Sequence, residues 1–337
     1  MSPRASPRAR RFFCQSARMP TGPPSNPTSS CSPPKTERST GIMGRDNPAT
    51  AINKTMDRAD LEIPAARKIV GELNGLITDF RARGLRISSW YGALDLPDDP
   101  ASSERVNRGY RYHPLDGAAD DRLFPWFLYW EIVWLSLNNE FQPGQRLLDL
   151  GGCSSLFSVY MASKGLEVTA VDLSRRLVFN GKRLARATGW PLRNVRRDIS
   201  KLTVREPFDH VTSICVYEHV PISGRIRLGA EVGHFLRPGG SYSITFDYLN
   251  PSRLAAIDSP NDVKQQFVQP TGLRVRGNRT FLDNGKRYLL HPAHHPLAAN
   301  KNWRKHYVEL GHLDQEAAET VSRSDEYTFG ALFLERP

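Results

Sequence analysis

Two stretches decide the fold of this chain: Arg146-Leu-Leu-Asp-Leu-Gly-Gly-Cys-Ser-Ser-Leu-Phe157 and Val168-Thr-Ala-Val-Asp172. Each holds a short apolar run that reaches a carboxylate, Asp149 or Asp172, as is typical of a buried strand. A loop of small residues and an apolar segment lie between them, which indicates a strand, a tight turn, a helix and a second strand. This order predicts the front half of a nucleotide-type cofactor site in a parallel α/β sheet.

The position of Asp149 indicates which cofactor the site takes. A dinucleotide site turns its first loop toward a pyrophosphate, and a carboxylate just before the first glycine would repel that anion. S-adenosylmethionine has no phosphate and carries a sulfonium and an ammonium group, which a carboxylate attracts. We therefore expect S-adenosylmethionine as the cofactor, and Asp149 opposes the alternative of a nicotinamide-dependent enzyme.

The pattern around these stretches alternates between strands and helices, which predicts βαβ units. Strands are expected at 146–150, 167–171, 192–196, 209–216, 241–247 and 329–334, and helices at 63–83, 123–138, 155–164, 174–188 and 222–236. Residues 271–290 are expected to form a hairpin that turns at Asp283-Asn-Gly285. The predicted class is α/β, with a Rossmann-like, seven-stranded, mostly parallel sheet and helices on both faces. A helical N-terminal extension and a β-hairpin insertion before the last strand complete it.

Three regions are expected along the chain. Residues 1–54 form a disordered basic tail, 55–140 a helical extension or lid, and 141–337 the cofactor-binding domain, with an insertion at about 250–312. The net charge is +11, but residues 1–42 hold seven of the basic side chains and one acid. Because much of the excess charge lies in this Pro- and Ser-rich tail, we expect no nucleic-acid partner.

Cysteine spacing, hydropathy and the histidines indicate where the protein is located and whether it binds a metal. The four cysteines form no Cys-x-x-Cys pair, and no apolar run reaches the length of a membrane span, so a cytoplasmic protein with no membrane span is expected. The histidines at 291, 294, 295 and 306 are interpreted as exposed loop residues, and no metal is expected. The oligomeric state cannot be predicted.

Five features, in order, resemble the class I S-adenosylmethionine-dependent methyltransferases of the small-molecule type. The segment 147–155 resembles the glycine-rich first motif of that family, and Asp172 stands where the family places its ribose-binding acid. Asp198-Ile199 falls at the adenine position, 208–220 resembles the fourth-strand motif, and 236–240 resembles the turn before strand five. The resemblance implies the Rossmann-like fold and methyl transfer from S-adenosylmethionine.

The resemblance also implies which residues hold the cofactor. Asp149 would accept from the ammonium group, directly or through water, the two glycines would let the backbone approach, and Asp172 would accept from both ribose hydroxyls. The full set is Asp149, Gly151, Gly152, Cys153, Ser154, Asp172, Leu173, Asp198, Ile199 and Val216. Asp198 could instead end its strand in a turn. Cys153 and Ser155 depart from the glycines usual in the family, so the loop must avoid positive φ there or carry strain, and a non-catalytic cofactor-binding relative stays an alternative.

Methyl transfer is an in-line displacement that needs a positioned nucleophile, and an O- or N-nucleophile must often lose a proton. His219 is the candidate general base, with Glu218 as an orienting or polar contact. The alternative is that His219 caps a helix or packs under the cofactor. The acceptor is expected to be a small molecule or a glycan or lipid precursor, methylated on O or N.

Two further groups of side chains could shape the acceptor pocket. Arg274, Arg276, Arg279 and Arg287 are candidates for contact with an anionic acceptor, although a solvated strand face explains them equally well. The aromatic side chains of 123–138 could line an apolar pocket, but core packing is favoured. An RNA methyltransferase is an alternative function; against it, base-amino enzymes carry an Asn/Asp-Pro-Pro-aromatic tetrad where this chain has Val216-Tyr-Glu-His219.

Overall fold

The computed structural model describes residues 50–88, 124, 126–249, 257–289 and 326–337, which all belong to the compact unit Gly44–Pro337. The predicted tail up to residue 49, much of the insertion and the four histidines between 291 and 306 lie outside the described residues. Within the described part, no helix has the length and apolar character needed to cross a membrane.

The sheet confirms the predicted Rossmann-like class. Its strands run in the order β1-β9-β6-β5-β2-β3-β4. Their bounds are β1 (Lys54–Thr55), β2 (Arg146–Leu150), β3 (Glu167–Asp172), β4 (Leu192–Arg196), β5 (Phe208–Ile214), β6 (Leu236–Tyr248) and β9 (Glu326–Glu335). The strands β2 to β6 pair in parallel, whereas β9 is antiparallel to both β6 and β1.

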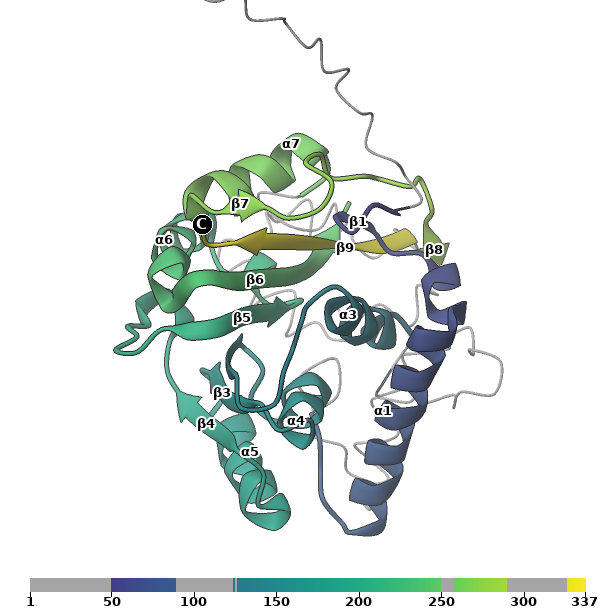
Figure 1. Ribbon diagram of the computed structural model, residues 1–337, viewed down its shortest axis with the longest axis vertical. Coiled ribbons are helices and arrows are strands. Elements are labelled where there is room, and N and C mark those ends of the chain that lie inside the picture. Colours follow the sequence, from purple (N-terminus) through teal and green to yellow (C-terminus); the bar gives the residue numbers. More distant parts are fainter. Residues whose placement is uncertain (1–49, 89–123, 125, 250–256, 290–325) are drawn as a thin grey trace, which may run out of the picture. The chain divides into compact units, whose positions relative to one another are not determined.

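Helices cover both faces of the sheet, as predicted (Figure 1). The side chains of β9 alternate between the two faces. Phe329, Ala331 and Phe333 join the core cluster built with α1 (Pro64–Ala82), α3 (Trp126–Leu137) and α4 (Leu156–Ser163). Leu332 and Leu334 join the opposite cluster, which includes α6 (Ile222–Phe235). Successive strand residues point to opposite faces, so one strand supplies both layers. Helix α5 (Arg175–Thr188) packs against β3 and β4.

Helix α3 is buried on all sides, which confirms core packing as the role of the aromatic segment. All its residues from Trp126 to Leu135 are buried. Its indole N–H groups find partners at the surrounding chain, since Trp130 Nε1 donates to Asp60 Oδ2 at 2.8 Å and Trp134 Nε1 donates to the Ile52 carbonyl at 2.9 Å. The one acid in this helix, Glu131, has 0% exposure.

The predicted hairpin at 271–290 is wrong. Its arms, β7 (Arg274–Val275) and β8 (Tyr288–Leu289), do not pair with each other but with opposite ends of β9. The expected turn is present, because Asp283 Oδ1 accepts from the Gly285 N–H at 2.9 Å. However, the residues before it pair with the N-terminal segment: Thr55 N donates to the Leu282 carbonyl at 2.9 Å. A local turn signal fixes the bend but not the partner strand.

Asn53 joins this N-terminal segment to the rest of the sheet. Its Nδ2 donates to the carbonyls of Arg276 at 2.7 Å and Asn278 at 2.8 Å, and its Oδ1 accepts from the Phe333 N–H at 2.7 Å. The side chain is fully buried, so three backbone groups of distant segments depend on one amide.

Replacing Asn53 with alanine should therefore destabilise the protein strongly. Three buried backbone groups would lose a partner at roughly 1 kcal/mol or more each, a loss of about 3 kcal/mol in the free energy of unfolding measured in urea. The matched control, Asn261→Ala, changes an exposed residue of α7 (Pro260–Val263) and should cost less than about 0.5 kcal/mol. Similar losses in both variants would contradict this role of Asn53.

Candidate active site

The candidate site lies where the strand order of the parallel sheet reverses. From β2 the chain proceeds through β3 to β4 on one side, whereas β5 and β6 lie on the other side of β2. In such sheets, ligands bind outside the carboxyl ends of the strands at this switch point. Asp149 and Asp172 lie at that edge on β2 and β3, and Asp247 lies near the same edge on β6.

Asp149 is deeply buried at the end of β2. Its side chain is buried, and three hydroxyls donate to it: Ser158 at 2.6 Å and Ser155 at 3.4 Å to Oδ2, and Thr212 at 3.0 Å to Oδ1. Burial raises the pKa of Asp149 to about 6, while these hydroxyls act in the opposite direction. The carboxylate therefore faces a cage of hydroxyls from α4 and β5, and its contact with a ligand ammonium group stays a prediction.

The two glycines after β2 have no room for a side chain. A Cβ on Gly151, whose φ is +82°, would lie 2.5 Å from both methyl carbons of Val216. A Cβ on Gly152 would lie 1.8 Å from Asp149 Oδ2. Glycine at these positions thus permits the tight turn, and it keeps the Asp149 carboxylate and Val216 against the loop backbone.

The loop after Gly152 has no further glycine, and only one of its next three residues takes a positive φ. Cys153 and Ser155 avoid positive φ, the first of the two outcomes expected, and Ser154 takes the left-handed conformation instead with φ +65°. Ser154 Oγ donates to the Leu177 carbonyl at 2.8 Å and accepts from Asn180 Nδ2 at 3.0 Å. The buried Cys153 thiol donates to the Ala170 carbonyl at 3.2 Å. The surroundings hold this unusual backbone in place.

Asp172 and Asp198 follow the next two strands. Asp172 Oδ1 accepts from the Ser174 N–H at 2.7 Å, and burial raises its pKa to about 6. Beside it, Leu173 is 62% exposed. Asp198 Oδ1 accepts from the N–H and the hydroxyl of Ser200 at 2.9 and 2.7 Å, so this carboxylate caps the short 3-10 turn that begins at the buried Ile199. Its proposed bond to adenine stays a prediction.

The predicted catalytic pair lies in the 3-10 turn η4 (Tyr217–His219) after β5. Glu218 is buried and its Oε1 accepts from the Asp247 N–H at 3.1 Å, which directs the carboxylate toward β6. His219 is partly exposed, and its backbone N–H donates to the Val216 carbonyl at 3.0 Å. Its role as a base stays a prediction.

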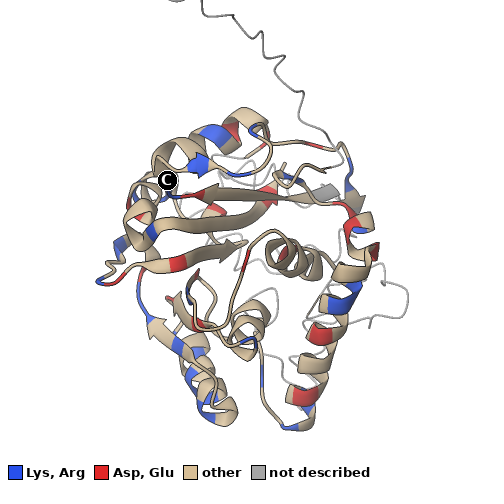
Figure 2. Ribbon diagram, viewed as in Figure 1, with Lys and Arg blue, Asp and Glu red and all other residues tan. Residues whose placement is uncertain are grey.

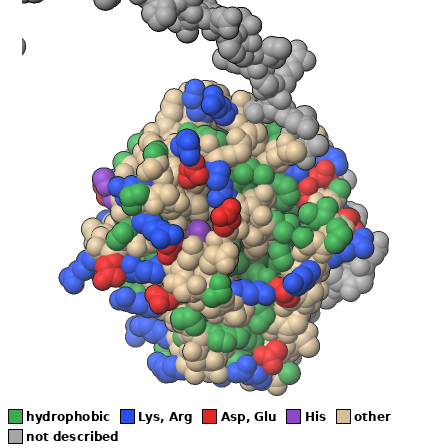
Figure 3. Space-filling model, in the orientation of Figure 1, with side chains coloured by type: hydrophobic (Ala, Val, Ile, Leu, Met, Phe, Trp, Pro, Cys, Tyr) green, Lys and Arg blue, Asp and Glu red, His purple; other side chains and the backbone are tan. Residues whose placement is uncertain are grey.

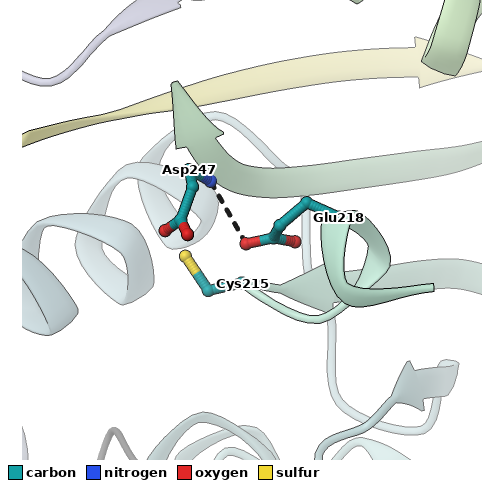
Figure 4. Close-up of side chains that lie close together, drawn as sticks. All are labelled: Cys215, Glu218 and Asp247. Carbon is teal, nitrogen blue, oxygen red and sulfur yellow. Dashed lines mark hydrogen bonds between the residues drawn. The ribbon is translucent and has the colours of Figure 1, made fainter. Parts of the chain in front are cut away.

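Three residues that sequence reasoning did not select lie beside Glu218. The Cys215 thiol donates to Glu131 Oε1 at 2.7 Å, and the Asp247 carboxylate lies close to the thiol (Figure 4). Burial, together with the charges of Glu218 and Asp247, raises the pKa of Glu131 to about 8. Burial also raises the pKa of the Cys215 thiol. In the sequence, only the position of Glu131 as a lone acid in an aromatic helix indicated a special role. Nothing in the sequence indicated one for Cys215.

Two of the arginines that were candidates for contact with an anionic acceptor form ion pairs with acids of the protein itself. Arg274 forms an ion pair with Glu335, whose strand partner Ser241 lies in the first half of β6, toward the edge opposite the carboxyl ends. Its interpretation as an acceptor contact is therefore wrong. Arg287 forms an ion pair with Asp283 at 2.7 Å.

Positive charge gathers instead on the flank formed by α5 and β4 (Figures 2 and 3). Between Asp172 and Asp198 the chain has no acid and eight basic side chains: Arg175, Arg176, Lys182, Arg183, Arg186, Arg193, Arg196 and Arg197. The excess of positive charge is therefore not confined to the N-terminal tail. The total charge of the residues after the tail hid this local concentration.

Residues 147–240 match the family model described as a methyltransferase domain. The match indicates a methyltransferase domain in this chain and supports a class I S-adenosylmethionine-dependent enzyme. It is 28% identical over 160 residues to the ubiquinone biosynthesis O-methyltransferase of Dechloromonas aromatica, covering 41% of this chain and 68% of the relative. It is 30% identical over 115 residues to the enzyme of the same name from Xanthomonas campestris pv. campestris, covering 34% of this chain but only 47% of that relative.

Among solved structures, the methyltransferase is similar to phosphoethanolamine N-methyltransferase 2 of Haemonchus contortus in complex with S-adenosyl-L-methionine. The identity is 18%, the match covers 60% of this chain and 51% of that one, and the TM-score is 0.40.

The residues at the carboxyl ends of β2 and β3 fit S-adenosylmethionine, the cofactor of this family. Two carboxyls with pKa values of about 6 are mostly ionised at neutral pH and favour a cationic ligand.

The affinity of the methyltransferase for S-adenosylmethionine should fall as the pH drops through 6. At pH 5 each carboxyl with a pKa near 6 would be about 90% protonated, a loss of about tenfold in affinity for each one that must be ionised. Calorimetric titration with S-adenosylmethionine at several pH values between 7.5 and 5 measures this loss of affinity.

A loss of affinity at low pH can be told apart from acid unfolding, because these two carboxyls affect stability in the opposite direction. Both pKa values are raised above 3.8, so the folded, ligand-free state binds more protons than the unfolded one. The contribution of these two groups to stability therefore increases as the pH falls from 6 toward 4. Cofactor affinity that stays constant from pH 7.5 to 5 would contradict the requirement for ionised carboxyls.

Gly152→Ala should reduce cofactor affinity more than tenfold, because the new methyl must displace the Asp149 carboxylate or the loop. The control is Gly75→Ala in α1, where a Cβ meets nothing within 4 Å. It should leave affinity unchanged and stabilise the protein by about 0.5–1 kcal/mol. Wild-type affinity in Gly152→Ala, measured by calorimetry, would show that the contact between Gly152 and Asp149 is unimportant for binding.

Proposed function

We propose that the protein transfers the methyl group of S-adenosylmethionine to an oxygen, or a nitrogen, of a small molecule or a glycan or lipid precursor. The observation that carries the proposal is the division of the carboxyl edge of the sheet into two halves. Carboxylates suited to a cationic cofactor occupy the β2–β3 half, and His219 and Glu218 occupy the end of β5 beside it. The two relatives described above are ubiquinone biosynthesis O-methyltransferases, which favours oxygen over nitrogen.

The chemistry of the β5–β6 half supports a particular kind of acceptor. Glu131, Glu218 and Asp247 place several acids around one position, so an anionic group at the reacting end of the acceptor would be repelled. A neutral hydroxyl or an amine is favoured there, since each offers hydrogen-bond donors to carboxylate oxygens. The acceptor proposed is therefore neutral or cationic where it reacts.

Each residue has a distinct task in this proposal. The cofactor supplies an activated methyl group on its sulfonium. Asp172 holds the ribose hydroxyls, Asp149 provides a negative field for the cationic part of the cofactor, and the backbone at Gly151 and Gly152 allows close approach. His219, at the end of β5, takes the proton from the acceptor hydroxyl as it attacks, a task for which an imidazole is the commonest side chain.

Two substitutions separate the assigned roles. Asp172→Ala should abolish detectable binding of S-adenosylmethionine in calorimetry, because both ribose hydroxyls lose their acceptor. His219→Ala should bind the cofactor like the wild type but lower kcat by about 10²–10⁴-fold, the usual contribution of a general base. Turnover is measured by release of S-adenosylhomocysteine with a panel of phenols, aliphatic alcohols and amines.

His234→Ala serves as the control, because this histidine is exposed near the end of α6, and it should keep both affinity and kcat. Equal loss of cofactor affinity in the Asp172 and His219 variants would contradict the roles assigned. Methylation of RNA, with no turnover of any small hydroxyl or amine compound, would overturn the proposed acceptor class.

A further inference from the structure

Four ionisable side chains from four different elements converge at the carboxyl ends of β5 and β6. Glu131 comes from α3, Cys215 follows β5, Glu218 lies in η4 and Asp247 lies near the end of β6. The Cys215 Sγ and one carboxylate oxygen from each of Glu218 and Asp247 lie within 4.8 Å of one another. Figure 4 shows these three side chains directed toward one another.

A second observation indicates that this group is arranged for a ligand. Glu131 has 0% exposure, and its Oε1 accepts from the Cys215 thiol and from Thr245 Oγ1 at 2.7 and 2.6 Å. Its Oε2 is equally buried and has no hydrogen-bond partner among the described residues. A buried carboxylate oxygen without a donor is costly, and a cation bound beside it, the thiol and the two further acids would offset that cost.

The backbone at Cys215 adds a third indication. Its φ is +45°, in the left-handed region that non-glycine residues rarely occupy. This conformation directs the thiol toward Glu131 while the Cys215 N–H still donates to the Thr245 carbonyl at 3.1 Å. Backbone of this kind persists where the surroundings enforce it, and it is common at functional sites.

We propose that Cys215, Glu218 and Asp247 form a binding site for one divalent transition-metal ion, with the Glu131 carboxylate as the fourth ligand. A thiolate together with carboxylates is a ligand set for Zn²⁺, and soft sulfur disfavours Mg²⁺ and Ca²⁺. Ligand atoms at about 2.0–2.3 Å from Zn²⁺ lie within roughly 4 Å of one another, so small side-chain rotations bring the observed group to the required geometry. Binding releases the thiol proton to solvent, because the thiolate is the ligand.

The site adjoins the cofactor loop. Val216, the next residue after Cys215, is the side chain that a Cβ on Gly151 would meet. An ion held by Cys215 therefore lies in the β5–β6 half of the edge, beside the cofactor half. One consequence rests on the proposed function: an acceptor oxygen that entered the ion's coordination shell would ionise more readily. Ion binding itself does not depend on that function.

The experiment uses the full chain after dialysis against a chelator. Titration of the protein with Zn²⁺ should give one tight equivalent by calorimetry, and elemental analysis after gel filtration should return one zinc per chain. Co²⁺ should produce a thiolate-to-metal charge-transfer band. Absence of a tight equivalent and of the band would overturn the proposal.

Two conservative variants show whether the ion binds at this group. Cys215→Ser should remove the charge-transfer band, and Asp247→Asn should weaken Zn²⁺ binding at least tenfold. The control, Asp79→Asn, makes the same change on the exposed face of α1 and should bind Zn²⁺ like the wild type. Wild-type Zn²⁺ affinity in both cluster variants would place the ion elsewhere and overturn the proposal.

Binding of S-adenosylmethionine by the same proteins separates this proposal from the proposed function. Neither cluster variant changes a predicted cofactor contact, so both should bind the cofactor like the wild type, which also shows that they are folded. Failure of acceptor turnover with intact Zn²⁺ binding would count against the proposed function alone, and loss of Zn²⁺ binding in the wild type would count against the ion site alone.

Discussion

The structure depends on keeping one carboxylate, Asp149, buried at the point where the sheet reverses its strand order. Three hydroxyls from α4, its N-cap and β5 converge on this side chain. The same hydroxyl cage links the first strand, the helix after the loop and the neighbouring strand. Because a buried carboxylate costs free energy unless donors or cations surround it, this arrangement both orders the local fold and favours a positively charged ligand.

The carboxyl edge of the sheet carries acids in two settings with different consequences. In the β2–β3 half, Asp149 and Asp172 have pKa values of about 6 and are mostly charged at neutral pH. In the β5–β6 half, Glu131 has a pKa of about 8 and lies beside Cys215, Glu218 and Asp247. The first setting suits a cofactor that carries its own positive charge. The second is more crowded with acids, and there the balance of charge depends on what the site binds.

The sequence predicted best what is encoded locally. The strands at 146–150 and 192–196 have the expected bounds, and α5 begins with Ser174 as its N-cap, where a helix was expected to start. Each depends on a short apolar run or a capping residue next to it. The left-handed Ser154 was not expected, because its conformation depends on Asn180 and on the Leu177 carbonyl. These contacts exist only once α5 packs beside the loop.

Features built from distant segments were missed for the same reason. The partner of residues 274–289 is β9 together with the N-terminal segment, and no turn signal could indicate that. Glu131 and Cys215 lie 84 residues apart and meet only after α3 packs on the sheet. In sequence they are an acid in an apolar helix and a cysteine in a strand, so neither residue type nor spacing connects them.

The central claim is that the Asp149 carboxylate near the carboxyl end of β2 selects a sulfonium cofactor over a dinucleotide. Calorimetric titration of the wild type and of Asp149→Asn with S-adenosylmethionine and with NAD⁺ tests it most directly. The wild type should bind S-adenosylmethionine with one site and give no saturable heat with NAD⁺, and Asp149→Asn should lose affinity for S-adenosylmethionine. Saturable binding of NAD⁺ with no heat from S-adenosylmethionine would contradict the account.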